Sequence, residues 1–183
     1  PSFGSWVSHA LGSVNKNLPS FVNIGRPSSP VQLTGGYLGA SVSATPFQAG
    51  LTPISNLHPP QSTLASERDR QMHLLEIMNA DFRRRHAMDS NIQARIKAYQ
   101  LAASMQLSAP EVVDFTREPA HIQALYGIDQ TPTKAFGEQL LLARRLTERG
   151  VRFIQICHAG GGNGGWDAHG DMKQHEPHCR ATD

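Results

Sequence analysis

The chain has 183 residues, a hydrophobic content of 39% and a formal net charge of +2, which suits one domain with its own core. The small net charge, with Arg83, Arg84 and Arg85 as the one basic cluster, gives no indication of a nucleic-acid partner. No apolar run approaches the roughly 20 residues that cross a bilayer, so we expect no transmembrane segment here.

The first third of the chain, residues 1–63, is rich in Gly, Pro and Ser and carries few charges. Residues 5–12 predict a short helix closed by Gly12, and residues 20–25 predict a short buried strand. The remainder is rich in turn-forming residues and contains isolated apolar residues, which we expect to pack against a larger body. These anchors are Tyr37, Leu38, Phe47, Leu51 and Ile54.

Two longer helices follow, over residues 64–87 and 90–107, because apolar residues recur there at steps of three and four. Ser66 is the expected N-cap of the first helix, and Pro110 marks the end of the second. A three-residue connection predicts an antiparallel pair that forms an inserted or peripheral layer. The expected buried stripes are Met72, Leu75, Met78, Asn79 and Phe82, then Ile92, Ile96, Tyr99 and Ala103.

The last third has the pattern of an α/β unit. A short helix over residues 121–126 ends at Gly127, and a stronger one over residues 133–149 ends at Gly150. The run "VRFIQIC" then predicts a strand with apolar residues on both faces, as in a parallel sheet. The predicted inward face of the longer helix carries Phe136, Leu140, Ala143 and Leu146.

A glycine-rich loop with Asp and His side chains leaves the end of that strand. In open α/β sheets ligands bind at the carboxyl ends of the strands, so the loop lies where a site is usually built. Asp167 and His169 are one residue apart and point the same way in an extended stretch, and Asp and His suit Zn²⁺ or Mn²⁺. A metal site and a solvated surface loop both remain open interpretations.

The other side chains near this loop have weaker patterns. Asp171 and His175 share a face if a helix starts nearby. No second cysteine pair gives a zinc-finger spacing, so His175, His178 and Cys179 are expected to be polar helix residues. His158, directly after the strand, fits either role.

The remaining candidates carry little chemistry. We expect Cys157 and Cys179 to be unlinked thiols rather than a disulfide. Ser2 and Ser5 lie in a glycine-flanked turn with no base identified beside them, which makes a nucleophilic serine a weak hypothesis. The sequence has no phosphate-binding loop, no dinucleotide fingerprint and no nucleophile elbow.

Several stretches appear in the same order as in a known bacterial family: "PSFGSWVSHALG", "PISNLHPP", "ARIKAYQLAASMQLSAPEVVDF", "EPAHIQALYGID", "LLLARRLTERGVRFIQI" and "GGWDAHGD". The chain resembles the domain of unknown function 1501 family, sulfatase-like proteins of the alkaline phosphatase superfamily, over nearly its whole length. The resemblance implies an α/β fold, part of a doubly wound alkaline-phosphatase/sulfatase-like sheet with a helical insertion.

The resemblance also implies a chemistry. Superfamily members hydrolyse phosphate or sulfate esters, or transfer phosphoryl groups, with a Ser, Thr or formylglycine nucleophile beside one or two divalent metals. Asp167 and His169 of the "WDAH" motif then correspond to metal ligands, with Zn, Mn or Ca as the ion. The substrate class is a sulfate or phosphate ester, carbohydrate esters included. The alternative is a non-catalytic module on the same fold that binds a metal or a carbohydrate.

The family's nucleophile region is expected before Pro1 and further ligand motifs after Asp183. We therefore expect residues 1–183 to be a single incomplete domain, with a loop-rich segment (1–63), a helical pair (64–107) and an α/β segment (108–183) that ends in the "WDAH" loop. Such a fragment is expected to be inactive alone. Family members commonly carry export signals, which favours the periplasm or cell envelope for the parent protein. The sequence indicates no oligomeric state.

Overall fold

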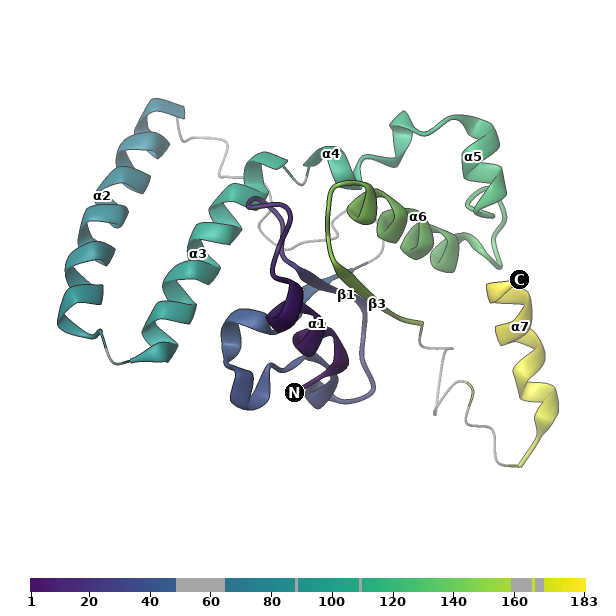
Figure 1. The fold of residues 1–183 in the computed structure, drawn as a ribbon. Coiled ribbons are helices and arrows are strands. Elements are labelled where there is room, and N and C mark those ends of the chain that lie inside the picture. Colours follow the sequence, from purple (N-terminus) through teal and green to yellow (C-terminus); the bar gives the residue numbers. More distant parts are fainter. Residues whose placement is uncertain (49–64, 88, 109, 159–165, 167–169) are drawn as a thin grey trace.

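Three short parallel strands form the centre of the fold, in the order β2-β1-β3 (Figure 1). The computed structural model describes residues 1–48, 65–87, 89–108, 110–158, 166 and 170–183. The strands are β1 (Phe21–Gly25), β2 (Thr45–Phe47) and β3 (Phe153–Cys157). The predicted strands at residues 20–25 and in "VRFIQIC" are confirmed, and "VRFIQIC" lies in a parallel sheet as expected.

The central strand β1 is paired on both sides. Val22 lies opposite Thr45 of β2 and Ile154 of β3. Four of its five residues are buried, since β1 has a strand on each edge and helices over both faces. The chain therefore has an α/β fold, with helices packed on a small parallel sheet.

One face of the sheet packs on α6 (Lys134–Glu148), on α3 (Ser90–Ser108) and on the short α4 (Pro110–Val113). The predicted inward face of α6 was only partly right, because Leu141 and Leu142 are fully buried with Leu146, whereas Phe136, Leu140 and Ala143 are half-buried. The core of this face consists of Leu18, Val22, Ile24, Phe47, Met105, Val112, Leu142, Leu146 and Val151.

Helix α1 (Phe3–Leu11) covers the opposite face. Its Gly4 lies so close to the rings of Phe21 and Phe153 that a side chain there would overlap both. The rings of Phe21 and Phe153 meet edge to face at 5.3 Å. The predicted end at Gly12 is confirmed, and that glycine has a φ of 63°.

Helices α2 (Ala65–Arg85) and α3 form the predicted antiparallel pair, which projects from one side of the sheet (Figure 1). Arg68 near the start of α2 donates to Gln106 near the end of α3, at 2.7 Å. Helix α2 already includes Ala65, so Ser66 lies in its first turn and is not the N-cap. The predicted stripe was wrong for Leu75, Met78 and Phe82, which are exposed.

Tyr99 on α3 is also exposed, whereas Ile96 is buried as predicted. Of the loop anchors, Phe47 is buried in β2, but Tyr37 is 77% exposed; Leu51 and Ile54 lie outside the described residues. The described part of the loop segment forms three single-turn 3-10 helices, η1 (Pro30–Leu33), η2 (Gly36–Leu38) and η3 (Ala40–Val42).

The remaining elements lie beside α6. The turn η4 (Phe115–Arg117) and helix α5 (Ala120–Leu125) precede it, and η5 (Met172–His175) and α7 (Glu176–Thr182) end the described chain, with α7 packed against α6. The predicted ends at Gly127 and Gly150 are confirmed by their positive φ angles. Within the described ranges, no helix has the length and apolar character of a membrane span.

Candidate functional site at the carboxyl edge of the sheet

The carboxyl ends of β1 and β3 meet at one edge of the sheet, where Gly25 pairs with Cys157. In open parallel sheets this edge is the usual place for a ligand, because the strands end together and their loops diverge there. The chain leaves β3 here through His158 and enters the loop that contains Asp167 and His169.

A row of polar side chains approaches this edge from the α1 face of the sheet. Asn23 is fully buried in β1, and its amide donates to the carbonyl of Gly25 at 2.8 Å. The thiol of Cys157 donates to the Asn23 side-chain oxygen at 3.2 Å, and Gln155 donates to the Cys157 sulfur at 3.3 Å. The buried amide is thus satisfied by both strands, which fixes their ends relative to each other.

Gly25 is the residue that allows the two strand ends to lie so close together. Its φ of 86° is a conformation that favours glycine, and a Cβ there would overlap the carbonyl oxygen of Cys157. From α6, the amide nitrogen of Gln139 lies 3.4 Å from where that Cβ would be. The Gln139 side-chain oxygen is buried and has no hydrogen-bond partner within the described part of the chain. An unpaired polar atom beside the strand ends is a candidate to contact a ligand.

His158 follows β3 directly and is half-buried against α6. Its ring lies 4.8 Å from the ring of Phe136. Burial lowers the pKa of His158 below its ordinary value, and the positive charge of nearby His178 lowers that pKa further. The imidazole is therefore neutral at pH 7 and can accept a proton or a hydrogen bond at this edge.

Trp166 of the "WDAH" motif lies against the histidines of the last two helical turns. Its ring centroid is 5.8 Å from that of His175 and 5.6 Å from that of His178. The Nε2 atom of His175 is buried and has no hydrogen-bond partner among the residues that are described. Both histidines were expected to be simple polar helix residues, yet they pack on Trp166 and are half-buried.

The predicted metal ligands, Asp167 and His169, lie outside the described residues. Within the ranges given above, no group of three or more His, Cys, Asp or Glu side chains is placed to hold a metal ion. Of the predicted cluster, the structure brings His175 of η5 and His178 of α7 together against Trp166. His158, directly after β3, lies near enough to His178 to be affected by its charge.

Asp171 has a structural role. Its carboxylate accepts from the backbone N–H of Lys173 at 3.0 Å and caps η5. Asp171 therefore lies one turn before α7. Cys157 and Cys179 are both free thiols, as predicted.

Ser2 and Ser5 also have structural partners. Ser2 is the N-cap of α1 and accepts from the Ser5 N–H at 3.3 Å, and the two hydroxyls lie 2.7 Å apart. Ser5 is fully buried and donates to the carbonyl of Thr34 at 3.1 Å. These bonds tie the start of α1 to the loop segment.

The sequence interpretation missed Asn23 and Gln139. The signal for Asn23 was available, since a polar side chain between Val22 and Ile24 in a buried strand requires hydrogen-bond partners. Gln139 has no comparable signal, because a glutamine on an amphipathic helix is equally compatible with solvent.

The family model described as "Protein of unknown function (DUF1501)" matches residues 1–183, the full length of the chain. Comparisons with curated proteins and with solved structures give no significant match.

Proposed function

The chain belongs to the DUF1501 family of proteins of unknown function, and from this premise we propose that it is a segment of a metal-dependent hydrolase of sulfate or phosphate esters. In this proposal its sheet is part of an alkaline-phosphatase/sulfatase-like sheet. Asp167 and His169 are two of the metal ligands, and the rest of the site comes from other parts of the parent protein.

One observation carries the proposal: the "WDAH" loop leaves the carboxyl end of β3, at the edge where Gly25 and Cys157 pair. Trp166, the residue before Asp167 in the sequence, packs on His175 and His178.

Asp167 and His169 supply an anionic oxygen and a neutral nitrogen, a donor set that suits Zn²⁺ or Mn²⁺, with Ca²⁺ as a further option for the carboxylate. A bound divalent ion would polarise the ester oxygens and stabilise the charge on the attacking and leaving oxygens. His158 presents a neutral imidazole at the same edge because of its lowered pKa. It is therefore the described residue best suited to accept a proton there.

Because members of the resembled family commonly carry export signals, we propose that the parent protein is located in the periplasm or cell envelope. The competing function is a non-catalytic module that keeps the fold and binds a metal or a carbohydrate. The two differ in turnover of an ester, so one set of measurements separates them.

The experiment uses the longest natural protein that contains these 183 residues. Its metal content is measured together with hydrolysis of an aryl sulfate and an aryl phosphate, for the parent sequence and for Asp167→Ala and His169→Ala. The matched control is Asp171→Ala, which removes a nearby carboxylate that caps η5.

The proposal expects both ligand variants to lose metal and activity while Asp171→Ala keeps both. Full metal content and full activity in Asp167→Ala and His169→Ala would overturn the site assignment. Metal binding without turnover of either ester would favour the binding module. The isolated 183-residue chain should bind Zn²⁺ no tighter than about micromolar, since two ligands leave the ion mostly hydrated.

A further inference from the structure

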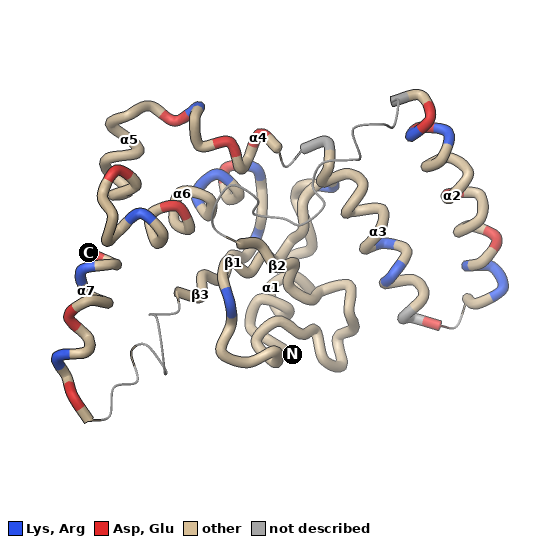
Figure 2. The backbone as a smooth tube through the Cα atoms, turned by 180° about the vertical axis from the view of Figure 1, so that it is seen from behind, with Lys and Arg blue, Asp and Glu red and all other residues tan. Residues whose placement is uncertain are grey.

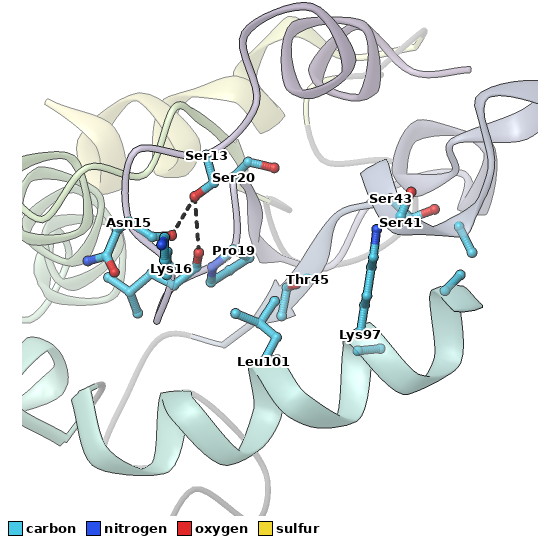
Figure 3. A pocket seen from close by; sticks show the side chains of 14 residues that line it. Ser13, Asn15, Lys16, Pro19, Ser20, Ser41, Ser43, Thr45, Lys97 and Leu101 are labelled. Carbon is cyan, nitrogen blue, oxygen red and sulfur yellow. Dashed lines mark hydrogen bonds between the residues drawn. The ribbon is translucent and has the colours of Figure 1, made fainter. Parts of the chain in front are cut away.

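A pocket of about 280 Å³ lies at the amino ends of β1 and β2, and the candidate site lies at the opposite, carboxyl ends of the strands (Figure 3). Ser20 immediately precedes β1 and Thr45 begins β2, and both line the pocket. Its other walls are the loop after α1, the segment around η3 and one side of α3. The volume is near the lower end for pockets that hold small molecules.

The charged residues that line this pocket are both lysines. Lys16 from the loop after α1 and Lys97 from α3 line it, and both side chains are exposed. The segments that form its walls, residues 12–20, 40–45 and 90–108, contain no Asp or Glu. The sequence has no Asp or Glu before α2, and Figure 2 shows no acidic residue over residues 1–48. A concave surface with two cations and no carboxylate in its walls attracts anions.

The polar atoms of the pocket are mainly hydroxyls. Figure 3 shows Lys97 reaching from α3 toward Ser41 and Ser43. Ser43 Oγ lines the pocket and accepts from the backbone N–H of Gly35 at 2.9 Å, so its hydroxyl can still donate a hydrogen bond. On the other side, Ser13 donates to the carbonyl of Asn15 and is already used within its loop (Figure 3).

Apolar side chains complete the wall. Leu18 and Pro19, at the end of the loop after α1, are buried, and Leu101 of α3 lies beside Thr45 (Figure 3). Hydroxyls, amines and aliphatic carbons in one small pocket match a ligand with the same three kinds of surface: an anionic group, several hydroxyls and a face of C–H bonds.

We propose that this pocket binds a small polyhydroxylated organic anion, a sugar acid or a sugar phosphate, with Lys97 as the principal anion contact. The pocket is separate from the carboxyl edge of the sheet, so the inference goes beyond the proposed ester hydrolysis and does not depend on it. Binding here is recognition without chemistry, because His158, the candidate proton acceptor, follows the opposite end of β3.

Binding is measured by two-dimensional NMR titration of the 183-residue chain with gluconate, glucose 6-phosphate, inorganic phosphate and glucose. We expect gluconate, glucose 6-phosphate or both to bind with dissociation constants in the millimolar range, and which of them binds identifies the anionic group. Lys97→Gln should weaken that binding about tenfold, as expected for loss of one charge-assisted hydrogen bond.

Arg95→Gln is the matched control, since it removes the same charge from the same helix, two residues away and outside the pocket lining. It should change the affinity less than about twofold through screened long-range charge. Lys97→Arg keeps the cation and should retain binding.

Three outcomes would overturn the inference. The first is an equal loss of ligand affinity in Lys97→Gln and Arg95→Gln. The second is equal affinity for inorganic phosphate and glucose 6-phosphate together with no binding of gluconate. The third is binding of uncharged glucose with the same affinity as the anions. Shifts in the Ser41–Thr45 amides that saturate with ligand, and that need about tenfold more ligand in Lys97→Gln, would support it. Since Lys97 is exposed, its substitution leaves the fold intact, which the unchanged remainder of the spectrum checks.

Discussion

Arg145 Nη1 lies 3.2 Å from Glu118 Oε1, and both side chains are largely buried, with 5% and 13% of their surfaces exposed. Arg144 holds the other oxygen of Glu118 at 2.7 Å. Arg145 also donates to the backbone carbonyls of Asp114 and Glu111. One guanidinium thus connects α6 to α4 and to the turn that follows it, and the pair of arginines in "ARRLTERG" acquires a structural reason.

Replacing Arg145 with Ala should therefore lower the free energy of unfolding by about 3 kcal/mol, because it leaves a buried carboxylate short of a partner and two carbonyls without a donor. Urea unfolding followed by circular dichroism measures the loss. Arg180→Ala is the control, since the Arg180–Glu176 pair is exposed and should contribute less than about 1 kcal/mol. Equal losses in the two variants would contradict a structural role for the buried pair.

Gly25→Ala should be more damaging than Gly12→Ala, although both glycines have a positive φ. At Gly12 nothing lies within 4 Å of the added carbon, so the cost is conformational, about 1 kcal/mol. At Gly25 the carbon also overlaps the Cys157 carbonyl, which should bring the loss to about 3 kcal/mol or more by separating β1 from β3. Thermal unfolding of both variants tests the difference, and similar midpoints would contradict the close approach of the strand ends.

Leu142→Ala and Leu74→Ala make the same chemical change in two different environments. Leu142 is fully buried in the core, so its truncation should cost about 2–5 kcal/mol. Leu74 on α2 is 57% exposed, and its truncation should change the free energy of unfolding by less than about 0.5 kcal/mol. Denaturant midpoints compare the two. A large loss in Leu74→Ala would show that α2 is covered in solution.

The pH dependence of stability should report on His158. Its pKa in the folded chain is below the ordinary value of 6.5, mainly through burial, so the unfolded chain binds the proton more readily. The stability that depends on this group is complete above pH 6.5 and is lost as the pH falls below 6.5 through the lowered folded pKa. The urea midpoint should thus fall between pH 7 and pH 5, and it should fall less in His158→Gln.

An NMR titration of the His158 ring tests the cause directly. His178→Ala should raise the pKa of His158 only part of the way back, because the charge of His178 is the smaller of the two causes. A complete return to the ordinary value in that variant would contradict burial as the main cause.

Local pattern was enough to predict most helices and two of the strands. Gly12, Gly127 and Gly150 marked real helix ends, because a positive φ is a local requirement that the sequence displays directly. Strand β2 was not predicted, since three residues around Pro46 carry no periodicity and pair only because β1 is beside them.

The exposed side of α2 shows where periodicity fails. Leu75, Met78 and Phe82 recur at helical spacing, which predicts a helix correctly but does not say what covers it. The candidate site, too, could be predicted from the sequence only in part. The strand-end position of the "WDAH" loop follows from the sequence, whereas the burial of His158 and its proximity to His178 depend on how α6 and α7 pack.

The order of the strands also has a consequence for how the chain folds. The central strand β1 is synthesised well before β3, which forms its longer ladder and follows only after α2 to α6. During synthesis one edge of β1 therefore lacks its partner, with Val22 and Ile24 available for wrong pairings. Closing a ladder between such distant segments is slow. Nascent chains should therefore depend on whatever protects that edge until β3 emerges.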